Sequence, residues 1–155
     1  MVGAGTGVAP FLGFLADRAA RLTEAQLSVA KAGETRLFFG CRNKDKDYIY
    51  REQLEDFHEK KLLTNLNVSF SRDGASETGK YVQHEMDKAG SDIWQLLEEK
   101  EAVLFVCGDA KNMAKDVNSM LVKIVANHGK IKESEAREYV AKLRLEKRYL
   151  EDIWT

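Results

Sequence analysis

The chain has 155 residues, of which 44% are hydrophobic and 32% are charged, a balance typical of one compact soluble domain. Its 24 Lys and Arg residues are offset by 25 Asp and Glu residues, and the net charge of −1 provides no general attraction to nucleic acid or to an anionic membrane. No apolar run approaches the roughly 20 residues that a bilayer-spanning helix requires. We therefore expect neither nucleic acid nor a membrane among the partners of this chain.

The two cysteines, Cys41 and Cys107, lack the close spacing of a zinc site, and no secretory signal pattern precedes them. Reduced thiols are typical of proteins in a reducing compartment. We therefore expect a cytoplasmic protein whose cysteines are free, and we expect no metal site.

The chain opens with three glycines, Gly3, Gly5 and Gly7, which alternate with small residues and lead into an apolar stretch containing Pro10. This order predicts a tight turn followed by a helix, since glycine allows close approach to the main chain and proline is accepted in a first helical turn. The G-x-G-x-G spacing differs from the G-x-G-x-x-G dinucleotide fingerprint and lacks the lysine of a Walker A loop. The turn therefore either holds an electron-rich group such as a phosphate, or is only a packed strand-to-helix connection.

The hydrophobic pattern predicts strands that alternate with helices along the chain. Only Met1 and Val2 precede the glycines, where a strand usually has about 5–6 residues, and we favour a chain cut from a longer protein over a stub strand. Further strands are expected at 35–41, 66–71, 102–107 and 148–155, and helices at 8–22, 50–58, 81–86, around 93–97, at 111–127 and at 134–145. This order predicts an α/β fold, with a doubly wound, Rossmann-like parallel sheet of about five strands in one domain over residues 1–155.

Residues suited to binding a nucleotide follow the predicted strands. In a doubly wound sheet the carboxyl ends of the strands meet at one edge, where ligands bind. That edge should carry residues 3–7, 41–42, 71–72, 107–109 and 152–155. A hydroxyl beside a guanidinium binds phosphate well, and a terminal indole is stabilised when a flat group covers it. This set indicates a nucleotide with an extra phosphate next to a redox-active ring, although Arg72 could be a solvated strand-end residue and Trp154 could pack on its own sheet.

Seven segments spread over the chain form a specific pattern: GAGTGVAPF at 3–11, FGCR at 39–42, DY at 47–48, FSR at 70–72, YVQ at 81–83, VCGDAKNMA at 106–114 and RYLEDIWT at 148–155. Together they resemble the NADPH-binding domain of the diflavin reductases, and within that family they are most similar to the methionine synthase reductases. The resemblance implies a nucleotide-binding domain of the ferredoxin–NADP reductase type, forming the C-terminal part of a longer FMN- and FAD-containing reductase.

The resemblance also implies where the nucleotide binds. Ser71 and Arg72 match the pair that holds the 2′-phosphate of NADPH, and Tyr81 matches the residue that stacks on adenine. Many relatives place a lysine two residues before this tyrosine, where this chain has Gly79 followed by Lys80. The other implied cofactor-binding residues are Gly5, Thr6, Cys41, Arg42, Lys80, Gln83, Asp109, Asn112, Met113, Asp116 and Trp154. On the residues alone, Cys41 could equally be a buried apolar side chain, and Asp116 could be a surface or capping residue.

Catalytic roles are implied for three residues near the end of the pattern. Cys107 and Asp152 match residues around the hydride that passes from nicotinamide to flavin, with a buried structural cysteine as the alternative for Cys107. Trp154 matches the terminal aromatic ring that covers the isoalloxazine of FAD. The implied cofactors are thus NADPH here and FAD and FMN in flavin-binding domains of the full-length chain, with methionine synthase or a haem protein as electron acceptor. A cytochrome P450 reductase-like donor, a single-flavin reductase and a non-catalytic nucleotide-binding or interaction module remain alternatives.

Overall fold

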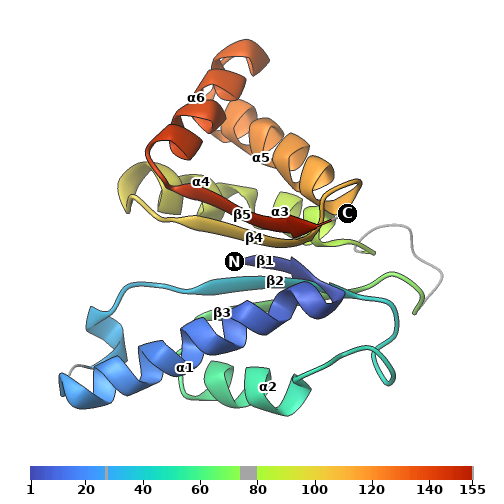
Figure 1. Ribbon diagram of the computed structural model, residues 1–155. Helices are drawn as coiled ribbons and strands as arrows, with labels where there is room; N and C mark the ends of the chain where they lie inside the picture. The colour runs from blue at the N-terminus through green and yellow to red at the C-terminus, as the bar shows by residue number, and fades with distance from the viewer. Residues whose placement is uncertain (27, 74–79, 155) are drawn as a thin grey trace.

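The computed structural model describes residues 1–26, 28–73 and 80–154, which form one five-stranded parallel sheet with helices on both faces (Figure 1). The strands are β1 (Val2–Ala4), β2 (Arg36–Cys41), β3 (Asn65–Phe70), β4 (Leu104–Asp109) and β5 (Tyr149–Trp154). The helices are α1 (Ala9–Glu24), α2 (Arg51–Glu59), α3 (Val82–Lys88), α4 (Gly90–Glu99), α5 (Met113–Gly129) and α6 (Glu133–Leu145), and the 3-10 turns are η1 (Gly5–Val8) and η2 (Val29–Lys31). The predicted α/β fold with a parallel sheet is confirmed.

The strand order is β3-β2-β1-β4-β5, so the chain builds outward from β1 on one side and then on the other. Each neighbouring pair of strands is parallel, and the carboxyl ends of the strands therefore share one edge. The strands β2 and β3 lie on one side of β1, and β4 and β5 are added on its other side. The direction of strand addition therefore reverses at β1. This change of direction is the place where open α/β sheets bind their ligands.

Two apolar cores lie on opposite faces of the sheet. One packs under α1 and α2 and contains Leu15, Phe39 and Leu54, and the other packs under α3, α4, α5 and α6. Successive side chains of a strand point to opposite faces, so Val106 belongs to the second core and its neighbour Cys107 to the first. Burial on both faces explains the continuous apolar runs of β2 and β4.

Several strand boundaries differ from the sequence-based expectation: β2 begins one residue later, β3 lies one residue earlier and β4 begins two residues later. Gly3 and Ala4 belong to β1 rather than to the turn that follows it. β4 does not end at Cys107: Gly108, with a φ of 145°, continues to pair with β5, and the strand ends at Asp109. β5 begins at Tyr149 rather than at residue 148, and Thr155 lies outside the described residues.

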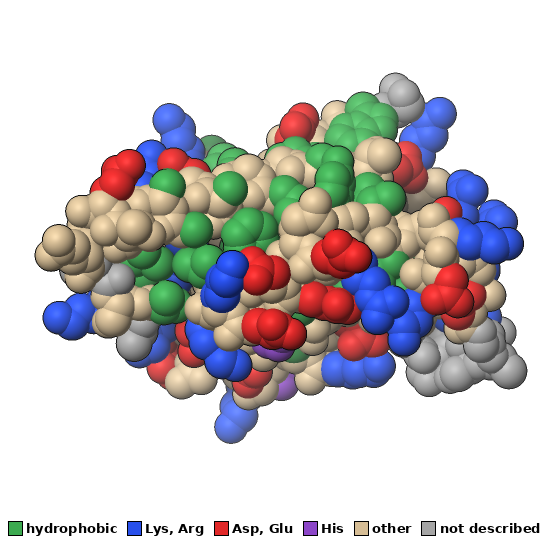
Figure 2. Space-filling model, turned by 90° about the horizontal axis from the view of Figure 1, so that it is seen from below, with side chains coloured by type: hydrophobic (Ala, Val, Ile, Leu, Met, Phe, Trp, Pro, Cys, Tyr) green, Lys and Arg blue, Asp and Glu red, His purple; other side chains and the backbone are tan. Residues whose placement is uncertain are grey.

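Charged side chains of both signs intermix on the face that Figure 2 shows, which is seen from below the view of Figure 1. Within α1 and α2, ion pairs join oppositely charged side chains: Arg21–Asp17 on α1 at 2.6 Å, Arg51–Glu55 on α2 at 2.8 Å and Lys60–Asp56 at the end of α2 at 2.7 Å. Such exposed pairs contribute little to stability, because solvent screens their charges. In the described part of the chain, no helix combines the length and apolar character that crossing a membrane requires.

Two glycines of the first turn serve different purposes. A Cβ added to Gly7 would lie 2.2 Å from the carbonyl oxygen of Cys107, which is backbone of β4, so only glycine lets η1 pack against this strand. Gly5 has a φ of 54°, and a Cβ there would meet nothing within 4 Å. Gly7 therefore closes the turn onto the sheet, whereas Gly5 leaves main chain open to the surroundings.

Replacing Gly7 with alanine should destabilise the fold by about 2 kcal/mol or more, because an added methyl group in a packed contact forces backbone to move. Gly13→Ala is the matched control, since a Cβ on Gly13 in the exposed middle of α1 would meet nothing within 4 Å. That control should raise stability by about 0.5–1 kcal/mol, the helix propensity difference. Urea unfolding of both variants measures the two effects, and equal stability of Gly7→Ala and wild type would contradict the close contact.

Candidate functional site

A cleft of about 840 Å³ opens at the carboxyl edge of the sheet, next to the change of direction at β1. Its walls come from the ends of β1, β2, β3 and β4, from the loop after β2, and from the starts of α3 and α5. The lining residues are Ala4, Gly5, Thr6, Gly40, Cys41, Arg42, Lys46, Asp47, Ile49, Ser71, Lys80, Tyr81, Val82, Gln83, Asp109, Asn112, Met113 and Asp116.

Most of the residues that the sequence assigns to nucleotide binding line this cleft. The exceptions are Arg72, Cys107, Asp152 and Trp154. Arg72 is exposed beside the cleft, where its N–H donates to the carbonyl oxygen of Arg42 at 2.8 Å. The backbone thus brings the ends of β2 and β3 together. Gly79, where many relatives have a lysine, lies outside the described residues.

Asp109 has a structural role at the cleft wall. Its carboxylate accepts hydrogen bonds from the N–H groups of Lys111 at 3.0 Å and Asn112 at 3.1 Å, and from the Asn112 side chain at 3.2 Å. The Lys111 hydrogen bond is the main reason why the pKa of Asp109 lies below its ordinary value of 3.8. The sequence predicts Asp109 as a cofactor contact, but its carboxylate already serves the turn that starts α5.

Asp116 and Gln83 join two elements that border the cleft. The side-chain nitrogen of Gln83 in α3 donates to Asp116 in α5 at 3.2 Å. This contact holds the starts of α3 and α5 together beside the cleft. Asp116 is exposed in the first turn of α5, where a surface acid is favourable, and its carboxylate also makes this contact at the border of the cleft.

Positive charge in the cleft comes from Arg42, Lys46 and Lys80. Arg42 and Lys46 are exposed to solvent, and Lys80 is half-buried. The hydroxyl of Thr6 and the open backbone at Gly5 lie in the same cleft. Cations, a hydroxyl and free main chain are the groups that proteins use to bind phosphate.

Tyr81 presents an aromatic ring at the cleft. The residue is 50% exposed and immediately precedes α3, and its ring meets that of His84 edge-on with centroids 5.8 Å apart. An exposed ring held from one side offers a stacking surface for a flat ligand.

Neither cysteine has the properties of a nucleophile. Burial raises the pKa of the Cys41 thiol to about 11, with smaller contributions from Asp47 and Asp73. Burial also raises the pKa of Cys107, which is only 3% exposed in the core under α1. Both thiols are neutral at physiological pH. The structure therefore places Cys107 as a buried side chain behind the cleft rather than in its wall.

Asp152 and Trp154 lie on β5, where they continue the same edge of the sheet. Asp152 pairs in register with Cys107, and Trp154 pairs with Asp109. Tyr149 is buried under α5 and α6, so strand alternation directs Asp152 and Trp154 to the opposite face of the sheet. Trp154 is 47% exposed, and hence its indole is not a core side chain of this domain.

The sequence reasoning missed the contribution of the loop after β2. Lys46, Asp47 and Ile49 from this loop line the cleft. A signal was present, because the charged turn at 43–47 directly follows a strand at the ligand-binding edge. Neither the composition nor the spacing of residues 43–47, however, shows whether this turn lines a ligand cleft or is only solvated.

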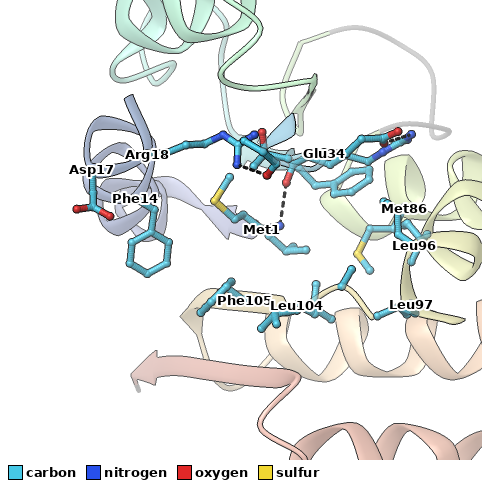
Figure 3. A pocket seen from close by; sticks show the side chains of 18 of the residues that line it. Met1, Phe14, Asp17, Arg18, Glu34, Met86, Leu96, Leu97, Leu104 and Phe105 are labelled. Carbon is cyan, nitrogen blue, oxygen red and sulfur yellow. Dashed lines mark hydrogen bonds and ion pairs between the residues drawn. The ribbon is translucent and has the colours of Figure 1, made fainter. Parts of the chain in front are cut away.

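A second hollow, of about 480 Å³, lies near the amino ends of the strands and is mainly apolar (Figure 3). Phe14 from α1, Leu97 from α4 and Phe105 from β4 point into it. The guanidinium groups that border it are already occupied: Arg18 donates to two carbonyl oxygens, Arg21 pairs with Asp17, and Arg36 pairs with Asp92 and Glu34. This hollow therefore does not provide a phosphate site.

Comparison with known proteins agrees with the geometry of the cleft. Residues 1–119 match the family model described as the oxidoreductase NAD-binding domain. The chain belongs to this family. Among the described residues of this NAD-binding domain, no group of three His, Cys, Asp or Glu side chains is arranged to hold a metal ion.

Curated relatives match the NAD-binding domain over its whole length. It is 46% identical over 155 residues to the NADPH–cytochrome P450 reductase of Mus musculus and 48% identical over 159 residues to the methionine synthase reductase of the same species. These matches cover 100% of this chain but only 22% and 23% of the relatives. The resemblance to reductases of this kind is thus confirmed, and the chain spans less than a quarter of their length.

The hydrogen bonds to Asp109 predict a pH-dependent loss of stability in acid. A carboxylate whose pKa is depressed by folding stabilises the fold above its unfolded pKa, and this contribution is lost as the pH falls through the folded pKa. The Asp109→Ala variant should therefore be less stable than wild type at neutral pH. The difference between the two free energies of unfolding should narrow as the pH falls below 3.8. Urea midpoints from pH 7 down to pH 3 measure this difference, and a constant gap would show that the Asp109 charge does not stabilise the turn.

Proposed function

We propose that this chain is the NADP(H)-binding module of a flavin-containing reductase. The observation that carries the proposal is the cleft at the change of strand direction, where an open glycine turn, several cations and an exposed tyrosine ring line one space. Family membership and the names of the relatives support the same conclusion.

The adenosine end of the nucleotide would lie toward β2 and β3. Tyr81 would stack on adenine, and Ser71, Arg42 and Arg72 would bind the 2′-phosphate. The N–H of Ser71 donates to the carbonyl oxygen of Cys41 at 2.9 Å, and that of Arg72 donates to Arg42, so the ends of β2 and β3 hold these residues side by side. A guanidinium keeps its charge at any physiological pH, which suits it to a phosphate dianion.

The pyrophosphate would lie over the first turn. Gly5 offers main chain without a side chain, and Thr6 adds a hydroxyl in the same cleft. On the other wall, Asn112 and Met113 stand at the start of the 17-residue helix α5. The Asp109 carboxylate already accepts hydrogen bonds from the N–H groups of Lys111 and Asn112 there, so the pyrophosphate would rely mainly on the open main chain of Gly5 and the Thr6 hydroxyl.

The nicotinamide end would lie toward β4 and β5. Asp152 stands beside Cys107 in the strand register, and the exposed indole of Trp154 follows at the end of β5. When bound, NADPH would supply a hydride, and an FAD held by a flavin domain of a longer chain would accept it. Trp154 would cover that flavin ring until nicotinamide takes its place, and Asp152 would help to orient the reacting groups.

We propose residues 1–155 as the NADP(H)-binding domain of a longer protein, because the chain spans only 22–23% of the relatives' length. FAD and FMN would be bound by the remaining domains. Electrons would pass through FMN to an acceptor protein, such as methionine synthase in a reductive reactivation or a haem protein of the cytochrome P450 type. The names of the relatives support both acceptors equally.

A second candidate function is nucleotide binding without hydride transfer. The burial of Cys107 favours it, because a thiol that is 3% exposed is not open to a nicotinamide ring in this conformation. In that case the adenosine half of the cleft would still function, and the β5 end would serve only as a contact surface.

Titration with 2′-phospho-AMP and with AMP tests the shared part of both functions. Hydrogen bonds to charged groups contribute about 1.5–3 kcal/mol each, so the 2′-phosphate should tighten binding at least about tenfold. Arg72→Ala should remove most of this difference and leave the affinity for AMP nearly unchanged. Isothermal titration calorimetry measures both affinities.

Arg137→Ala is the matched control, because Arg137 lies on α6 and pairs with Glu133. This variant should keep the preference for 2′-phospho-AMP. Equal affinity of the wild-type protein for the two nucleotides would overturn the assignment of the 2′-phosphate site.

A further inference from the structure

Asp73 connects the two loops that lead away from β2 and β3. Its carboxylate accepts a hydrogen bond from the side chain of Asn43 at 2.7 Å and another from the backbone N–H of Lys44. These two hydrogen bonds, led by that from Lys44, hold the pKa of Asp73 below its ordinary value of 3.8, so Asp73 is ionised at physiological pH. A single exposed carboxylate thus ties the loop after Arg72 to the loop after Arg42.

Hydrogen bonds between Asn43 and Asp47 close the base of the loop after β2, which Asp73 contacts. Asp47 accepts a hydrogen bond from the N–H of Asn43 at 2.9 Å, and its own N–H donates to the carbonyl oxygen of Asn43 at 3.0 Å. Lys46 lies within this short closed segment and lines the cleft. The position of Lys46 therefore depends on a loop whose ends are fixed by Asp47 and whose outer side is fixed by Asp73.

We propose that Lys46 binds the phosphate on the adenosine ribose and that Asp73 is the positioning residue for this contact. The inference rests on the proposed function and extends its 2′-phosphate site to a second loop. Arg42 and Lys46 approach that phosphate from the β2 side, and Ser71 and Arg72 approach it from the β3 side. Asp73 joins the two sides through its hydrogen bonds to Asn43 and Lys44.

The chemistry of Lys46 suits a phosphate ligand, and that of Asp73 suits a residue that positions the loop. Lys46 is an exposed ammonium on a flexible stem, so its contribution to phosphate binding depends on where its loop is held. Asp73 is a poor phosphate ligand itself, since like charges repel. Its carboxylate is instead directed at the Asn43 side chain and the Lys44 N–H.

Calorimetric titration of single variants with 2′-phospho-AMP and AMP tests the proposal. Lys46→Ala should weaken 2′-phospho-AMP binding about tenfold and change AMP binding less than about twofold, since one charge-assisted contact is lost. Asp73→Ala should weaken only 2′-phospho-AMP binding, by about threefold to tenfold, and Asp73→Glu should restore part of it. Lys100→Ala, in the loop between α4 and β4, removes the same charge away from the cleft and should bind like wild type.

The outcomes separate this proposal from the proposed function. A wild-type preference for 2′-phospho-AMP that Lys46→Ala retains in full would overturn the role of Lys46 and leave the proposed function intact. Weakening of both nucleotides by Asp73→Ala would overturn its positioning role, because a general structural defect has no phosphate selectivity. A wild type without preference would overturn both proposals. Thermal melts of each variant establish that the protein titrated is folded.

Discussion

The architecture depends on the close contact between the backbone of Gly7 and the carbonyl of Cys107. This contact seats the turn after β1 directly against β4, the neighbour of β1 on the side away from β2. Gly7 is packed against β4, whereas Gly5, two residues earlier, presents open main chain to the cleft. A packed glycine and an open glycine thus lie in one short turn at the place where the strand order changes direction.

The strand order then distributes different chemistry along one edge. On the β2 and β3 side the edge carries hydroxyl, guanidinium, ammonium and tyrosine groups, and on the β5 side it carries a carboxylate and an exposed indole. Four strand spacings separate β3 from β5, which amounts to about 19 Å at roughly 4.8 Å each. An elongated ligand with a charged end and a flat end matches this layout better than a compact one. The amino edge, by contrast, is hollow and apolar, and its guanidinium groups are occupied by protein partners.

Much of the fold was predictable because its signals are local. Buried strands such as β2 and β4 produce continuous apolar runs, and α1 carries a helical stripe from Phe11 to Leu15. The end of β4 was not predictable, because Gly108 is usually a strand breaker and continues the strand here only through its pairing with β5. Among the site residues, Ser71 follows the end of a predicted strand and Tyr81 is implied by the family resemblance. Lys46 instead lies in a loop that hydrogen-bonds to Asp73, and these bonds join positions about 30 residues apart. The burial of Cys107 likewise comes from α1 and η1 packing over it, a tertiary effect that its own segment does not reveal.

Backbone NMR during titration with NADP⁺ tests most directly whether the carboxyl edge of the sheet binds the nucleotide. The amide signals of Gly5, Thr6, Arg42 and Ser71 should shift together, while those of Phe14 and Leu97 at the amino-edge hollow should stay in place. Shifts confined to the amino-edge hollow, or no saturable shift at the first turn, would contradict binding at the carboxyl edge.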